Sequence, residues 1–160
     1  MSAVVRPFTA PNDGGRFRRY DSLFLMGDFK KLKVWRKGHA LALNVHRVTS
    51  RIRGSQHAGL RNQMIRAAMS IPTNVVEGNG QRSSADFSRF VRFALNSSSE
   101  LEYHLIVARD IRVINSSDFA SLSAQNIEVR KMLHGLIRYL MTRANDSAYT
   151  GRDAAKRQQG

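Results

Sequence analysis

The spacing of the apolar residues is the feature that most constrains the fold of this chain. In four separate stretches, apolar residues recur every three or four positions, which is the pattern of a helix with one buried face. Breaks rich in glycine or small polar residues separate these stretches at Gly54-Ser55-Gln56, Gly78-Asn79-Gly80 and Asn115-Ser116-Ser117. No stretch shows the alternation of a half-buried strand. We therefore predict an all-α fold, an antiparallel up-down-up-down four-helix bundle with disordered N- and C-terminal tails.

The breaks and caps set the expected boundaries. The first helix is predicted from roughly Phe29 to Ile52, and the second from about Leu60 to an end near Gly78-Asn79-Gly80. Ser83 or Ser84 is expected to cap the third, and the Asn115 segment to end it and cap the fourth. A chain of 160 residues is long enough for one core. We expect one bundle domain over residues 29–143, between a disordered leader, 1–28, and a disordered tail, 144–160.

The leader contains a short apolar island, Leu23 to Met26. Two interpretations are open: the island docks on the bundle, or translation starts at Met26 rather than Met1. The leader lacks the sustained apolar run and cleavage site of a secretory signal, and no stretch approaches the roughly 20 apolar residues of a membrane helix. We expect a cytoplasmic protein with no membrane partner.

Pro72 lies inside the apolar stripe of the second helix, where a proline removes one backbone hydrogen bond. We expect a kink or a helix restart there, with Ser70, Thr73 and Asn74 bonding the freed backbone groups. The small polar run Asn96-Ser97-Ser98-Ser99 interrupts the third stripe and predicts a tight helix crossing. Both features are interpreted as structural rather than catalytic.

Catalytic chemistry finds little support. The chain has no cysteine, which excludes disulfides and thiolate ligands. Glu100 and His104 share a helix face, but they are a single isolated pair of candidate ligands. His39 and His46 have no acid near them in sequence. We expect no cofactor and no metal. One hypothesis is an enzyme that uses Asn74, Glu77 and Glu100 in a polar pocket, and it is weaker than the two binding hypotheses given below. We therefore predict that the protein is not an enzyme and has no catalytic residue.

Positive charge is the strongest functional signal. The net charge is +14, and the predicted bundle between Lys30 and Arg143 holds 19 basic and 7 acidic residues. Such an excess repels itself and is typical of a polyanion-binding protein. Basic residues three or four apart share a helix face, and few acids stand at pairing distance in the sequence. The candidate phosphate contacts are Lys30, Lys33, Lys37, Arg47, Arg51, Arg89, Arg92, Arg109 and Arg112.

Aromatic side chains offer a second kind of nucleic-acid contact. Trp35, Tyr20, Tyr103 and Tyr139 can stack on unpaired bases. Trp35 borders the stripe that begins at Val34, which favours packing against the bundle instead.

Several short motifs occur together and in a fixed order. They are Phe29-Lys30-Lys31-Leu32-Lys33-Val34-Trp35, Gly59-Leu60-Arg61-Asn62-Gln63, Ser70-Ile71-Pro72-Thr73-Asn74, Glu77-Gly78, Phe87-Ser88-Arg89-Phe90 and Glu100-Leu101-Glu102. With them the chain resembles the bacterial proteins encoded in intervening sequences of 23S ribosomal RNA genes, from about Asp28 to Arg143. The family-motif residues expected to be structural are Trp35, Gln63, Ser70, Pro72, Asn74, Glu77, Gly78 and Glu100.

The resemblance implies an antiparallel four-helix bundle and a ring-shaped homopentamer. A protein of similar architecture, the accessory protein of diversity-generating retroelements, works with a reverse transcriptase and RNA. The leading hypothesis is therefore a non-enzymatic, oligomeric protein that binds nucleic acid, RNA rather than DNA, through the phosphate backbone. The alternative is a scaffold that docks another protein, such as a reverse transcriptase, on its basic surface.

Overall fold

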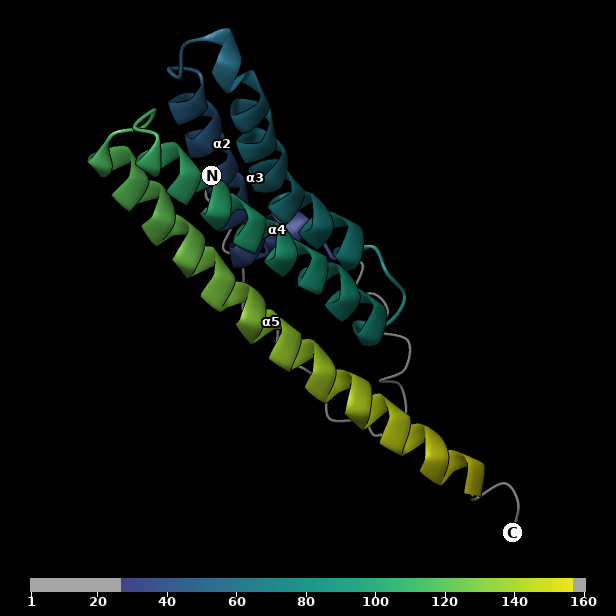
Figure 1. Cartoon of the computed structure of the whole chain (residues 1–160). Coiled ribbons are helices and arrows are strands. Elements are labelled where there is room, and N and C mark those ends of the chain that lie inside the picture. The colour runs from purple at the N-terminus through teal and green to yellow at the C-terminus, as the bar shows by residue number, and fades with distance from the viewer. Residues whose placement is uncertain (1–26, 157–160) are drawn as a thin grey trace, which may run out of the picture.

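Four long helices form an antiparallel bundle in the computed structural model, which describes residues 27–156 and side chains up to residue 146 (Figure 1). The chain runs through a short 3-10 helix η1 (Phe29–Lys31), α2 (Lys33–Thr49), a second 3-10 helix η2 (Ser55–His57), α3 (Ala58–Asn79), α4 (Ser84–Asp110) and α5 (Ser116–Lys156). The described residues contain no strand. The predicted all-α bundle is confirmed. The apolar island of the leader lies outside the described residues.

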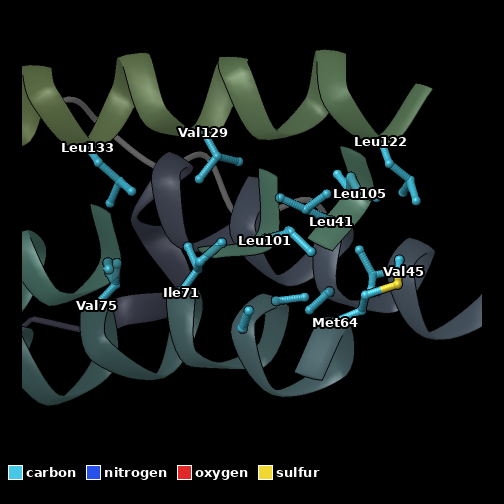
Figure 2. Close-up of a cluster of buried hydrophobic side chains, with 14 of the residues drawn as sticks. Leu41, Val45, Met64, Ile71, Val75, Leu101, Leu105, Leu122, Val129 and Leu133 are labelled. Atoms are coloured by element: carbon cyan, nitrogen blue, oxygen red, sulfur yellow. The ribbon is translucent and has the colours of Figure 1, made fainter. Parts of the chain in front are cut away.

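Each helix packs against the next, and α5 returns to α2, so the four helices close a ring around one core. Side chains from all four point into this core, as Figure 2 shows. The largest of them are completely or almost completely buried: Leu41 and Val45 from α2, Met64, Ile71 and Val75 from α3, Leu101 and Leu105 from α4, and Leu122, Val129 and Leu133 from α5. The three-four spacing of the sequence therefore marks the buried faces.

Two of the long helices, α4 and α5, start with side-chain caps. The Ser83 hydroxyl accepts a hydrogen bond from the Asp86 backbone N–H at 3.0 Å, and Asp86 lies in the first turn of α4. The Asn115 side chain accepts one from the Asp118 N–H at 2.8 Å before α5. These bonds satisfy donors that lack a partner within the first helical turn, as the sequence predicted.

The first predicted helix is divided in two. Leu32 has extended backbone, with φ −70° and ψ 117°, and separates η1 from α2. The Asp28 side chain accepts a hydrogen bond from the Lys30 N–H and so caps η1 separately. At the other end α2 stops at Thr49, three residues before the predicted end at Ile52. The prediction of one continuous helix from Phe29 to Ile52 is therefore wrong at both ends.

Pro72 does not interrupt α3, which is helical from Ala58 to Asn79. The expected restart is absent. The Thr73 hydroxyl donates to the Met69 carbonyl at 2.9 Å, and the Asn74 amide donates to the Ser70 carbonyl at 2.9 Å. Neither acceptor is the Ala68 carbonyl, which is the group that Pro72 frees, so the predicted bond to the freed group is not confirmed. The helix continues through the proline.

Helix α5 extends further than the sequence indicated. The predicted bundle ends at Arg143, whereas α5 continues to Lys156 and projects beyond the other three helices in Figure 1. Between Arg143 and Gly151 the sequence contains no proline or glycine, so nothing local ends the helix. Among the described residues, no helix is long and apolar enough to cross a membrane.

Candidate nucleic-acid interface

Six arginines gather where the α2–α3 and α4–α5 connections meet, and we call this region the arginine end. It comprises Arg47, Arg51, Arg53, Arg61, Arg109 and Arg112. Two contacts join its parts. The Arg51 guanidinium lies 2.9 Å from both carboxylate oxygens of Asp118, and the Arg109 guanidinium lies 4.6 Å from the centroid of the Phe119 ring. The segment that follows α2 and the C-terminal turn of α4 therefore meet the first turn of α5 here.

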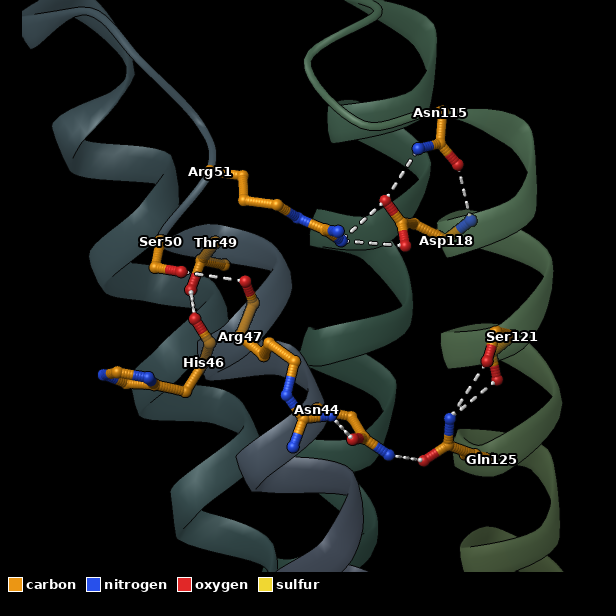
Figure 3. Close-up of polar contacts among 10 residues, drawn as sticks. All are labelled: Asn44, His46, Arg47, Thr49, Ser50, Arg51, Asn115, Asp118, Ser121 and Gln125. Atoms are coloured by element: carbon orange, nitrogen blue, oxygen red, sulfur yellow. Dashed lines mark hydrogen bonds and ion pairs between the residues drawn. The ribbon is translucent and has the colours of Figure 1, made fainter.

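Figure 3 shows how the α2–α5 side of this end is held. Asp118 binds Arg51, and it also accepts a hydrogen bond from the Asn115 amide at 2.8 Å. One turn further along, the Asn44 amide donates to the Gln125 side chain at 2.7 Å. Asn44 in turn accepts a hydrogen bond from Arg47 at 2.6 Å. The guanidinium groups are therefore oriented by short polar contacts while they stay exposed to solvent.

Arg112 occupies a backbone conformation that usually selects glycine. Its φ is +59°, and it is the only non-glycine residue with positive φ in the described part of the chain. The Val113 N–H bonds the Ala108 carbonyl, and the Arg112 N–H bonds the Arg109 carbonyl, both at 2.9 Å. This is a Schellman ending of α4, in which the left-handed position is normally Gly or Asn. An arginine there costs roughly 1 to 2 kcal/mol of strain.

Arg53 and Arg61 were not among the predicted contacts. Both line a cavity of about 500 Å³ beside the α2–α3 connection, together with His46 and Ser55. Sequence reasoning considered only basic residues that share a helix face, and Arg53 lies in a connection. The sequence feature that could have identified them is the presence of an arginine on each side of the turn at Gly54.

The other five predicted contacts lie away from the arginine end. Lys30 is in η1, Lys33 and Lys37 are near the start of α2, and Arg89 and Arg92 are near the start of α4. Lys33 and Arg47 are 14 residues apart on one helix, about 20 Å at 1.5 Å per residue. The nine residues therefore do not converge on one spot, and four of them, Arg47, Arg51, Arg109 and Arg112, lie at the same end of the bundle.

The expectation that few acids stand near these cations is wrong for four of the nine. Lys37 pairs with Glu128 at 3.0 Å and Arg51 with Asp118 at 2.9 Å. Arg89 lies 3.8 Å from Asp86, and Arg109 pairs with Asp110 at 2.7 Å. Exposed pairs of this kind contribute at most about 1 kcal/mol, because water and salt screen them. Phosphate groups can compete for the same guanidinium and ammonium groups.

The family-motif residues are mostly structural. A Cβ on Gly78 would collide with the Phe87 ring and stand 2.9 Å from the Phe90 Cβ, so a side chain is excluded where α3 meets α4. Pro72 is buried, and Trp35 packs against the edge of the core with its ring stacked on His39 at 5.1 Å. Gln63 is exposed, and its side chain forms no hydrogen bond with another described residue.

The α3–α4 crossing predicted from the serine run is present. The Ser97 hydroxyl donates to the Ser70 hydroxyl at 2.9 Å, and the Asn74 amide also reaches the Ser70 hydroxyl at 3.0 Å. Ser97 and its neighbour Ser98 are buried. Small side chains let the two helices approach closely here, which is the interpretation that the sequence favoured.

The three residues of the enzyme hypothesis do not form a site. Glu77 precedes Gly78, which contacts Phe87 and Phe90 on α4. Glu100 lies ten residues beyond Phe90, about 15 Å along that helix. Both glutamates are exposed, and Glu100 is 3.5 Å from His104. The described residues include no group of three or more His, Cys, Asp or Glu arranged to hold a metal ion.

A buried polar network between α4 and α5 was missed by sequence reasoning. The Ser98 hydroxyl donates to the Asn126 side chain, and the Asn126 amide donates to the Ser98 carbonyl, both at 2.9 Å. Arg130 donates to the Ser98 carbonyl at 3.3 Å and to Glu102 at 2.8 Å. Asn126 stands four residues after Leu122 and three before Val129, in the core stripe of α5. A polar residue at a core position of the stripe could have indicated a buried hydrogen-bond network.

An apolar groove of about 310 Å³ lies between α2 and α3. Trp35, Ala42, Pro72 and Val76 line it, together with His39 and His46. Leu43 and Met69 border it with about half of their surface exposed, 52% and 56%. The two histidines are exposed and line this groove, and neither forms an ion pair with an acid in the described part of the chain.

Comparison with known proteins finds one matching family and a solved structure of similar fold. Residues 30–135 match the family described as 23S rRNA-intervening sequence protein. The fold is similar to a crystal structure of a protein with unknown function from the S23 ribosomal protein family of Bacteroides thetaiotaomicron. The two chains are 25% identical with a TM-score of 0.61, over 65% of this chain and 97% of the other. No curated protein matches.

Proposed function

The chain belongs to the 23S rRNA-intervening sequence protein family, and from that premise we propose that it binds nucleic acid, RNA in preference to DNA, through the phosphate backbone. The arginine end is the centre of the interface. There Arg47, Arg51, Arg109 and Arg112 contact phosphates, and Arg53 and Arg61 add to them. Lys30, Lys33, Lys37, Arg89 and Arg92 make outer contacts with longer strands.

The observation that carries this proposal is the imbalance of charge at the arginine end. Six arginines come together there, and Asp110 and Asp118 are the acids that pair with two of them. Arg53 and Arg112 form no ion pair with another described residue. Guanidinium groups suit phosphate because they present several donors in a planar fork. Contacts of this kind fix a strand without reading its sequence.

The proposed activity is binding without catalysis. Neither the family's description nor that of the similar structure names an enzymatic activity. The polar residues that an enzyme would use are dispersed over α3 and α4, or they are bonded within the bundle. The protein is proposed to need no cofactor and to work in the cytoplasm, where ribosomal RNA is found.

Self-association is part of the proposal. The family resemblance implies a homopentamer, and the bundle leaves large apolar side chains exposed that subunit contacts would cover. Phe93, Ile106 and Ile127 keep 47%, 37% and 44% of their surface exposed. A ring of five subunits would repeat the arginine end five times, so one long RNA could bind several subunits with higher avidity.

Binding measured across a salt series tests the proposal. Fluorescence anisotropy of labelled single-stranded RNA, duplex RNA and DNA of one length gives the dissociation constants. We expect log K to fall linearly with log salt, with a slope of about −0.7 for each neutralised phosphate of a single strand. We also expect weak sequence preference and tighter binding to RNA than to DNA. Binding that does not respond to salt contradicts the proposal.

A scaffold for another protein is the second candidate, and the α2–α3 groove favours it. Leu43 and Met69 expose apolar surface next to a basic bundle, which suits a partner segment that is apolar and flanked by acids. Pull-down with Leu43→Glu and Met69→Glu variants separates the candidates. Loss of a co-purifying protein with unchanged RNA affinity would assign the groove to that partner.

A further inference from the structure

The cavity beside the α2–α3 connection has a polar lining that contains two arginines. Its volume is about 500 Å³, within the range of sites that hold small molecules. No described aspartate or glutamate lines it. Its polar lining consists of His46, Thr49, Ser50, Arg53, Ser55, Arg61 and Asn62. Its wall is therefore cationic and rich in hydrogen-bond donors.

Arg61 is held in position before any ligand arrives. One guanidinium nitrogen, Nη1, donates to the Ile52 carbonyl at 3.0 Å and to the Gly54 carbonyl at 2.9 Å. The side chain is half-buried, and the described residues provide no acid partner for it. Nη2 and Nε carry the donors that these bonds leave over. A fixed guanidinium loses little side-chain freedom when it binds an anion.

Four more polar side chains line the same cavity without a side-chain hydrogen bond to another described residue: Arg53, Ser55, Asn62 and His46. Gly54, between the first two, has φ +93°, and that backbone conformation joins Arg53 to the short helix η2. Helix α3 starts just beyond with no acid in its first turn, so no internal carboxylate competes for these donors. The cavity combines two cations with neutral donors.

We propose that this cavity binds the phosphate group of a ribonucleotide. Arg61 and Arg53 neutralise the phosphate, Ser55 and Asn62 add hydrogen bonds, and the remaining volume accommodates the attached nucleoside. This deepens the proposed function and rests on it for RNA as the source of the nucleotide. A free mononucleotide carries the same group, so it serves as the probe.

Isothermal titration calorimetry on the full chain, at low salt, tests the site with three probes: adenosine 5′-monophosphate, inorganic phosphate and adenosine. We expect the first two to bind and adenosine not to bind. Arg53→Gln is the main variant, because Arg53 supports no other described residue, and we expect it to weaken mononucleotide binding about tenfold, the loss of one charge-assisted contact. Arg61→Gln is a second variant, used only if its thermal unfolding matches the wild type, because Arg61 also ties two carbonyls.

Arg82→Gln is the matched control, since Arg82 is exposed in the α3–α4 connection at the other end of the bundle. Its mononucleotide affinity is expected to equal the wild type's. Equal losses in Arg53→Gln and Arg82→Gln, or adenosine binding as tightly as its phosphate, would overturn the site. RNA binding without any mononucleotide or phosphate binding overturns the cavity alone. Mononucleotide binding without RNA binding retains the cavity, assigns it to free nucleotides and overturns the proposed function.

Discussion

The buried polar network between α4 and α5, which we call the α4–α5 seam, and the arginine end treat polar side chains in opposite ways. In the seam, Ser98 and Asn126 are 0% and 1% exposed, and each bonds the other. At the arginine end, Arg53 and Arg112 are exposed and form no ion pair with a described residue. Buried polar groups are costly unless bonded, so the seam selects one alignment of two helices. Exposed cations add little to folding, which leaves them available for a ligand.

This comparison distinguishes residues that hold the helices together from residues that are available to bind a ligand. Gly78, Ser70 and Asn74 belong to the family motif and act at helix contacts. The arginine end lies largely outside those motifs, although Arg61 is within one of them. The motif residues therefore explain the fold, and the search for function moves to the connections between helices.

The largest effect is expected from Gly78→Ala, in the interior. The new Cβ would lie 2.8 Å from the Phe87 Cε2 atom and overlap that ring, so α3 and α4 would have to move apart. Overpacking of this kind costs about 3 kcal/mol of unfolding free energy. Gly135→Ala in α5 is the matched control, because its Cβ meets nothing within 4 Å and alanine favours a helix. Urea unfolding of both variants measures the difference. Equal stability of the two would show that the α3–α4 contact tolerates a side chain.

The next effect is expected from Asn126→Ala in the α4–α5 seam. The change leaves the Ser98 hydroxyl and carbonyl without their bonds to Asn126, inside the bundle, at a cost of about 2 kcal/mol. Asn96→Ala serves as control, since Asn96 is exposed on α4. Thermal and urea unfolding measure both. If the Asn126 variant is as stable as the Asn96 variant, the network does not determine how the two helices pair.

A smaller effect of opposite sign is expected at the arginine end. Arg112→Gly removes the strain at φ +59° and is expected to stabilise the fold by about 0.5 to 1 kcal/mol, after allowing for the greater freedom of glycine in the unfolded chain. RNA binding weakens, and the salt slope falls by about 0.7. Arg112→Ala loses the same charge but keeps the strain, so it should lose affinity without gaining stability. Equal RNA affinity in all three proteins would remove Arg112 from the interface.

The smallest stability change is expected from Asp118→Asn. The exposed pair with Arg51 contributes about 0.5 kcal/mol, so folding hardly changes. RNA binding should become tighter, because Arg51 loses a competing carboxylate and the arginine end gains one net charge. Anisotropy titration against the wild type measures this. The control is Glu77→Gln, because Glu77 is exposed near the C-terminal end of α3, away from the arginine end, and pairs with no described cation. Weaker RNA binding in the Asp118 variant would contradict the placement of the interface.

The sequence predicted the fold well because the helical period records burial directly. The stripes, the Ser83 cap and the serine crossing are local patterns, and each has its predicted place. The 144–156 part of α5 was not predicted as helix, because its polar composition gives no stripe to count. Asn126 was overlooked, although a polar residue in the core stripe of α5 can be recognised from the sequence alone.

The candidate site was less predictable, because it is made by three-dimensional proximity. Basic residues on one helix face can be found by spacing, which identified Arg47 and Arg51. Their proximity to Arg109 and Arg112 depends on how the bundle closes, and Arg53 and Arg61 depend on the path of the α2–α3 connection. The pairing of Arg51 with Asp118 joins residues 67 positions apart, beyond the reach of any local pattern.

The most direct test of the account compares two triple variants that each remove three positive charges. One replaces Arg47, Arg53 and Arg112 at the arginine end by Gln, and the other replaces Arg36, Arg82 and Arg138, which are exposed elsewhere. None of the six pairs with an acid among the described residues. The account predicts that the salt slope of RNA binding falls by about 2 for the first variant, at 0.7 for each lost contact, and stays near the wild-type value for the second. Equal changes in both would mean that the net charge of the whole bundle attracts RNA and that the arginine end is not its binding site.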